Sequence, residues 1–217
     1  MKIQMIAAAI AVLAAFTAPT HAATMWAEKD GPNNRMTVSI KGPISSGDAN
    51  QFNTIVANFP PGSLVAISSP GGLMDEGLKI GQAIHQKQFK TLAIGKCLSM
   101  CATIWLAGTE RFLYPYAIIG FHGVYTREEA NAQNGIRKII ARISGDGNAQ
   151  VIQFIKQLGF DEYVAHELTK ESPSSFNLLT GQRPEQLGIK MTVIQPNSIT
   201  VRLPLQPHME SPKAVGG

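Results

Sequence analysis

The sequence predicts an α/β fold built from βαβ units around a mostly parallel sheet. Between residues 36 and 125, short runs rich in β-branched residues alternate with longer runs whose apolar residues recur every three or four positions. Glycine and proline stand between most of these runs and favour turns there. Strands that alternate with helices of this length are typical of parallel strands joined by crossover helices.

Each element of this region follows from a local signal. The first helix has its apolar residues at helical spacing, with Asp48 as a candidate N-cap and Pro60-Pro61-Gly62 as its stop. Pro115 separates the last two short strands. In chain order we expect a strand at 36–42, a helix at 48–59, a strand at 63–69, a helix at 74–88, a strand at 91–96, a helix at 100–108 and two strands within 110–125.

The pattern changes after the last of these strands. A long helix is predicted over residues 128–160, interrupted at 144–147 by Ser-Gly-Asp-Gly, where the sequence alone allows either a kink or a break. A shorter helix is expected at 161–170, followed by late strand material within 191–205. Residues 204–217 are rich in proline and small residues and are expected to form a flexible tail.

The N-terminus has the three-part pattern of a secretory signal peptide. Lys2 is basic, residues 5–16 are apolar, and Thr20-His21-Ala22 resembles a small-residue cleavage signal. The apolar part is shorter than the ~20 residues that span a bilayer, although an uncleaved anchoring segment is the alternative. We therefore expect a signal peptide at 1–22, a single domain at 23–203, and a periplasmic or secreted protein in a compartment that permits disulfides.

Composition narrows the class of function. Hydrophobic residues make up 44% of the chain, which fits a globular protein, and the net charge is +4. The basic residues are scattered rather than clustered, so we expect no nucleic-acid partner. The sequence contains no phosphate loop, dinucleotide fingerprint or metal motif, and we expect no cofactor and no metal.

Three loops at the carboxyl ends of predicted strands carry the candidate chemistry, because open α/β sheets bind ligands there. They contain the turn Ser69-Pro70-Gly71-Gly72, Ser99 at a strand-to-helix corner, and His122 between two glycines. Each has a simpler interpretation: an ordinary turn, an N-cap serine and a surface or core histidine. Together, however, they provide a nucleophile, a base and oxyanion donors for acyl transfer.

The amino-acid sequences of these segments and their order along the chain resemble those of the Clp protease proteolytic subunit and its relatives in the ClpP/crotonase superfamily. The segments that carry the resemblance are VAISSPGGLMDEGLKIGQAI, GKCLSMCATIWLAG and IIGFHGV, within a match over residues 36–124 that resumes at LLTGQRPEQLGI. The resemblance implies a spiral of βαβ units with a mostly parallel sheet. It also implies a serine hydrolase, a peptidase. Export away from any ATPase would then restrict its substrates to short or unfolded peptides.

The resemblance assigns the site residues one by one. Ser99 corresponds to the nucleophile, His122 to the general base, and the N–H groups of Gly72 and Met100 to the oxyanion hole. The family's aspartate would fall just before LLTG, where this chain has Asn177. Asn177 is our candidate to orient His122, and Glu171 is the nearby alternative.

Three departures from the family pattern keep other functions open. Without its carboxylate the triad would be slow or degenerate, so a non-catalytic binding module and a crotonase-type acyl-CoA enzyme are alternatives. An exported protein would have no ATPase partner, and peptides are the expected substrates. The interruption at 144–147 means that paired rings do not follow from the resemblance, and a homo-oligomer of another kind is an alternative.

Cys97 and Cys101 are the only cysteines of the chain, and they lie on either side of Ser99. Residues four apart on a helical turn have Cα atoms about 6 Å from each other, which is within disulfide range. In an oxidising compartment we therefore predict a Cys97–Cys101 disulfide that holds the corner at Ser99. Two buried free thiols or a metal pair are the alternatives.

Overall fold

The computed structural model describes residues 22–30, 35–131, 137–143, 145–172 and 174–194. Its main sheet has eight strands in the order β1-β2-β3-β4-β5-β10, with β6 paired to β4 and β9 paired to β6. The pairs β2–β3, β3–β4, β4–β5, β4–β6 and β5–β10 are parallel, whereas β1–β2 and β6–β9 are antiparallel. The strands are β1 (Thr24–Asp30), β2 (Arg35–Lys41), β3 (Leu64–Ser69), β4 (Lys90–Leu98), β5 (Arg111–Leu113), β6 (Ile118–Phe121), β9 (Asn177–Leu178) and β10 (Thr192–Val193).

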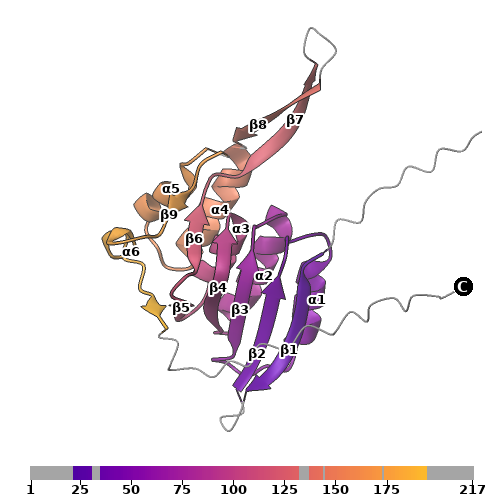
Figure 1. The fold of residues 1–217 in the computed structure, drawn as a ribbon, viewed down its shortest axis with the longest axis vertical. Coiled ribbons are helices and arrows are strands. Elements are labelled where there is room, and N and C mark those ends of the chain that lie inside the picture. The colour runs from indigo at the N-terminus through magenta and orange to yellow at the C-terminus, as the bar shows by residue number, and fades with distance from the viewer. Residues whose placement is uncertain (1–21, 31–34, 132–136, 144, 173, 195–217) are drawn as a thin grey trace, which may run out of the picture.

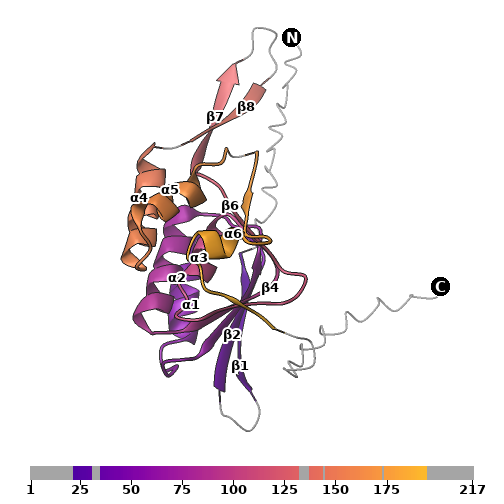
Figure 2. The same ribbon diagram turned by 90° about the vertical axis from the view of Figure 1, so that its left-hand side faces the viewer.

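Three helices cover one face of this sheet, as Figures 1 and 2 show. They are α1 (Asp48–Ile55), α2 (Met74–Gln86) and α3 (Met100–Leu106). Fully buried side chains from both layers form the main core between them, among them Val38, Ile40, Ile67, Ile80, Ile84 and Trp105. The later helices α4 (Gly145–Gln157) and α5 (Glu162–Thr169) pack beside them, and α6 (Arg183–Gln186) is a single short turn.

The longest strand of the sheet, β4, has two successive partners. Residues 91–93 pair with β5, and residues 96–98 pair with β6. The sheet therefore turns along the length of β4, as expected for a spiral of βαβ units. The carboxyl end of β4 lies beside the carboxyl end of β6, and this arrangement positions the candidate site.

The predicted helix over 128–160 is wrong in its first half. The structure has a two-stranded antiparallel sheet instead, formed by β7 (Tyr125–Asn131) and β8 (Arg137–Ile143), which extends away from the rest of the molecule (Figure 1). The sequence between these strands contains Asn134-Gly135, a strong signal for a hairpin turn. The helix begins only at Gly145, so residues 145–147 lie in its first turn and are neither a kink nor a break inside a longer helix.

The structure differs from the sequence-based expectations at two points near the N-terminus. The N-cap of α1 is Gly47 and not Asp48, because the Asp48 carboxylate binds the N–H groups of Ser45 and Ala23 and not those of its own helix. Strand β1 was not predicted.

The expected signal peptide and C-terminal tail lie outside the described residues, except for Ala22. Among the described residues, no helix has both the length and the apolar character needed to cross a bilayer.

Candidate active site

Ser99 lies at the corner between β4 and α3 with an unusual backbone conformation. Its φ is 57° and its ψ is −128°, a region that non-glycine residues rarely occupy and that costs about 1–3 kcal/mol. Ser99 has the N-cap position of α3, yet its side chain makes no capping hydrogen bond. Its Oγ has no hydrogen-bond partner among the described residues, so the N-cap interpretation does not account for the hydroxyl.

The turn at Gly71-Gly72 packs directly against this corner. A Cβ added to Gly71 would lie 2.6 Å from the Ser99 Cβ and 3.1 Å from the Met100 nitrogen, so only glycine allows this approach. A Cβ on Gly72 would lie 2.1 Å from the carbonyl oxygen of Ile44. Neither the Gly72 N–H nor the Met100 N–H donates a hydrogen bond to a described residue. Two N–H groups without described partners therefore border this contact: that of Met100, which follows Ser99, and that of Gly72, which follows Gly71.

His122 follows β6 and emerges at the same edge of the sheet as Ser99. Leu98 pairs with Gly120, and the Ser99 N–H donates a hydrogen bond to the Gly120 carbonyl at 2.8 Å. His122 lies two residues beyond that carbonyl. Among the described residues, the hydrogen bonds include none between Ser99 Oγ and the His122 ring. The sheet therefore brings the backbone of Ser99 close to the strand that leads into His122, without a hydrogen bond between the two side chains.

The His122 ring is held in one protonation pattern. Its Nδ1 lies 2.6 Å from the carbonyl oxygen of Gly123. A carbonyl oxygen can only accept, so Nδ1 carries the proton, and in the neutral ring Nε2 is then the acceptor. The ring also packs against Tyr125 and Phe176, with centroids 5.4 and 5.1 Å away. A histidine with a free Nε2 is in the form that a general base requires.

The peptide that orients His122 is itself held by other residues. The Val124 N–H, in the same peptide unit as the Gly123 carbonyl, donates to Asn148 Oδ1 at 2.7 Å. Asn148 Nδ2 donates to the Thr169 carbonyl at 3.3 Å, and the Gly123 N–H donates to the Glu171 carbonyl at 3.0 Å. Sequence reasoning missed Asn148, and no local pattern distinguishes it, because its role depends on two backbone groups from other elements.

The two candidates for the third triad position have other partners. Asn177 pairs with Phe121 across β9 and β6 and is buried, and its Nδ2 donates to the Glu167 carbonyl at 2.7 Å. The Glu171 carboxylate accepts from Ser175 Oγ at 3.2 Å. Among the described residues neither side chain is hydrogen-bonded to His122, and the Gly123 carbonyl has that position instead. The orienting role of Asn177 stays a prediction.

The disulfide between Cys97 and Cys101 is present, as predicted. The two Cα atoms are 5.0 Å apart and both side chains are fully buried. Cys97 lies near the end of β4 and Cys101 lies in the first turn of α3, so the bond connects the two sides of the corner at Ser99. It restricts the strand-to-helix corner from the side of the core.

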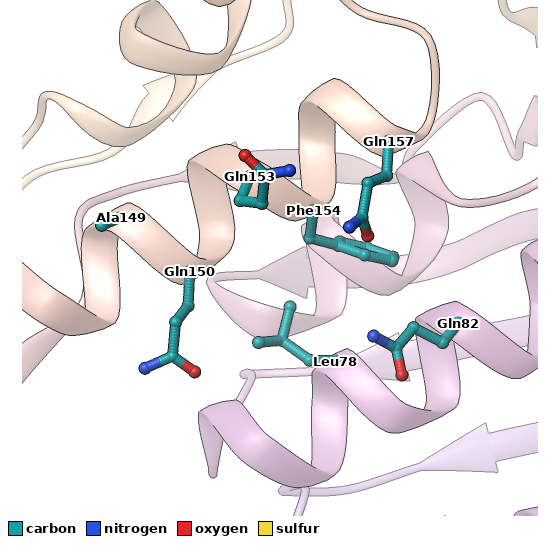
Figure 3. Close-up of a pocket in the computed structure, with 7 residues that line it drawn as sticks. All are labelled: Leu78, Gln82, Ala149, Gln150, Gln153, Phe154 and Gln157. Carbon is teal, nitrogen blue, oxygen red and sulfur yellow. The ribbon is translucent and has the colours of Figure 1, made fainter.

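A cavity of about 370 Å³ lies elsewhere, between α2 and α4. Figure 3 shows its lining, in which Leu78 of α2 and Phe154 of α4 lie between the two helices and four of the other residues are glutamines. Ser99, His122 and Gly72 are not part of this lining. The lining residues are Leu78, Gln82, Ala149, Gln150, Gln153, Phe154 and Gln157.

Comparisons with known proteins establish the fold. No protein-family model matches the chain, and a search of curated proteins finds no match. Among solved structures, the chain is similar to a mutant of the membrane-bound stomatin-specific protease 1510-N, with a TM-score of 0.54 and 23% sequence identity. The similarity covers 73% of this chain and 79% of that one. The chain therefore shares the fold of that protease, a ClpP/crotonase-type fold.

This result confirms the predicted architecture of the chain and its resemblance to ClpP-fold proteases. The ClpP/crotonase fold also explains why the three loops meet, since each follows a parallel strand of the same sheet. At this level of identity the similarity concerns the fold, and the specificity in the other protein's name belongs to that protein.

Proposed function

We propose that this chain is an exported serine hydrolase of the ClpP/crotonase fold that acts as a peptidase on short or unfolded peptides. The observation that carries the proposal is the corner at Ser99. Its backbone is strained, and neither its hydroxyl nor the nearby Gly72 and Met100 N–H groups have a hydrogen-bond partner among the described residues. Strained backbone of this kind is concentrated at functional sites. The signal-peptide pattern and the disulfide support export to the periplasm or beyond.

The proposed mechanism assigns one role to each residue. The Ser99 Oγ attacks the substrate carbonyl while His122 Nε2 takes its proton, and His122 later protonates the leaving amine. The N–H groups of Gly72 and Met100 bind the tetrahedral oxyanion; removing one such donor typically costs about 100-fold or more in turnover. Water then hydrolyses the acyl-enzyme by the same path in reverse. No metal, cofactor, nucleic acid or ATPase partner enters this scheme.

A fluorophosphonate probe tests the proposal, because it labels activated serines covalently. We expect labelling of the wild type at Ser99, mapped by peptide mass spectrometry, no labelling of Ser99→Ala, and slow labelling of His122→Ala. Ser172→Ala is the matched control, since Ser172 is a serine whose Oγ contacts Ser174 near the surface. Equal labelling, and equal hydrolysis of a peptide and ester panel, by the wild type and Ser99→Ala would refute the proposal.

A binding module on the same fold is the second candidate. It is favoured by the absence, among the described residues, of both a Ser99–His122 hydrogen bond and a carboxylate hydrogen-bonded to His122. Such a protein would bind peptides without labelling at Ser99. Calorimetric titration with unfolded peptides, run beside the probe experiment, separates the two functions.

A further inference from the structure

We propose that the chain is cut between Ala22 and Ala23, and that the new α-ammonium group of Ala23 forms a buried ion pair with Asp48. This pair would connect the start of the mature chain to the loop that supports the Gly71-Gly72 turn. Its effect on catalysis rests on the proposed function, whereas its effect on stability does not.

Asp48 is a buried carboxylate whose present partners are all uncharged. It is 1% exposed, and its Oδ2 accepts hydrogen bonds from the Ser45 N–H at 2.7 Å and the Ala23 N–H at 3.2 Å. Among the described residues, no lysine, arginine or histidine side chain forms an ion pair with it. Buried carboxylates are usually balanced by a positive group, because removing a charge from water is costly.

The Ala23 nitrogen is already in the position that such a positive group needs. Ala23 is 3% exposed and lies beside Gly42, whereas Ala22 is exposed, so the chain reaches the surface at the bond between them. Hydrolysis adds water across this bond, leaves Ala22 with a carboxylate and gives Ala23 an amine that takes up a proton. The hydrolysis is assigned to a peptidase that recognises small residues, in keeping with Thr20-His21-Ala22.

The position of the cut matters for this contact. A cut one residue earlier would leave the ammonium on the exposed Ala22, away from Asp48. A cut one residue later would remove the Ala23 nitrogen altogether. Only the bond between Ala22 and Ala23 yields an ammonium group at the hydrogen-bonding distance that the structure shows.

The loop held by Asp48 also contacts the candidate oxyanion hole. Ile44, the residue before Ser45, makes two backbone hydrogen bonds with the segment around the turn. Its N–H donates to the Gly71 carbonyl at 2.8 Å, and its carbonyl accepts from the Leu73 N–H at 2.9 Å. The same Ile44 carbonyl is the atom that excludes a Cβ from Gly72. Fixing the loop through Asp48 therefore fixes the peptide that presents the Gly72 N–H.

The first experiment determines where the mature protein begins. The full chain, with its own residues 1–22, is expressed in a host that exports it, and the intact mass of the product is measured. We expect a mature protein that starts at Ala23. An uncut chain, or a start at any other residue, would overturn the processing half of the proposal.

The second experiment measures the ion pair by a double-mutant cycle. The protein starting at Ala23 is compared with one that retains Ala22, each with and without Asp48→Asn, and the unfolding equilibrium constants are measured in urea. We expect Asp48→Asn to raise the unfolding constant by about tenfold more in the Ala23 form than in the form that retains Ala22, because only the Ala23 form loses an ion pair. Equal effects in both forms would overturn the ion pair.

Two further measurements keep the proposal testable. If Asp48→Asn does not fold, the Ala23 form with an acetylated N-terminus replaces it, and an unfolding constant equal to that of the free amine overturns the pair. We also expect the fluorophosphonate to label the form that retains Ala22 about tenfold more slowly. If neither form is labelled at Ser99, the proposed function fails while the stability result still decides the ion pair.

Discussion

Replacing Asn148 by alanine tests how His122 is oriented without a carboxylate. Asn148 holds the Gly123–Val124 peptide through the Val124 N–H, and the carbonyl of that peptide accepts from His122 Nδ1. Asn148→Ala leaves two backbone groups, the Val124 N–H and the Thr169 carbonyl, without their present partner. The Gly123 carbonyl then becomes free to rotate, and the proton on Nδ1 loses its fixed acceptor.

The magnitude follows from these two hydrogen bonds. An unsatisfied buried group costs about 1–3 kcal/mol, and because Asn148 is only half-buried we expect a loss of about 2 kcal/mol in the free energy of unfolding. The hydrogen-bond partners that orient metal-ligating histidines typically contribute about 10- to 100-fold to activity, and we take the same range for the group that orients His122. We expect kcat to fall by about that factor with little change in KM, because substrate contacts are unaffected.

The decisive assay observes the ring itself. Long-range ¹H–¹⁵N NMR of the labelled protein at about pH 9, where histidines are ordinarily neutral, shows which ring nitrogen carries the proton. We expect Nδ1–H in the wild type and a rise of Nε2–H in Asn148→Ala. Asn148→Asp, which keeps an acceptor for the Val124 N–H, should retain Nδ1–H. Asn177→Ala should retain it too, because the Asn177 amide bonds to the Glu167 carbonyl.

Two results would refute this reasoning. One is a wild-type His122 with its proton on Nε2. The other is a folded Asn148→Ala protein with an unchanged tautomer and an unchanged kcat. A shift in Asn177→Ala alone would return the orienting role to Asn177.

Two other predictions concern the same corner. Gly72→Ala should cost about 1–3 kcal/mol and abolish probe labelling, because its Cβ would meet the Ile44 carbonyl; Gly47→Ala, with positive φ but open space, is the control, and equal labelling of both variants would contradict the close approach. Replacing Cys97 and Cys101 together by alanine should cost about 2 kcal/mol, since the closed loop has only about five residues. The rate at which the probe labels Ser99 should fall by more than this loss of stability accounts for. Thiol titration of the denatured, unreduced wild type should find no free thiol, and finding two would disprove the bond.

The parallel core was predictable because its signals are local. Residues 36–121 have strong periodicity with glycine or proline at the boundaries, and β2, β3, β4, α2 and α3 lie close to where the sequence placed them. The meeting of Ser99, His122 and the Gly71-Gly72 turn followed from one rule, that parallel strands end at a common edge. Strands β9 and β10 have only two residues each and carry no periodic signal.

The hairpin shows why periodicity alone misleads. Ile136, Ile139, Ile140 and Ile143 have the three-and-four spacing of an amphipathic helix, which is why a helix was expected. All four are β-branched, and Asn134-Gly135 precedes them, so the turn and the β propensity together outweigh the spacing. The orienting partner of His122 was missed for another reason. A backbone carbonyl has no sequence signature, and a comparison of side chains could offer only Asn177 or Glu171.

The disulfide also has a consequence for oxidative folding. A chain with two cysteines has one possible intramolecular pairing, so the oxidised monomer has no mispaired isomer to correct. The two thiols are four residues apart, and their encounter does not depend on the distant strands that must come together to complete the sheet. Oxidation can therefore fix the strand-to-helix corner while the rest of the chain is still assembling, and the slower long-range pairing then completes the site around a corner that is already closed.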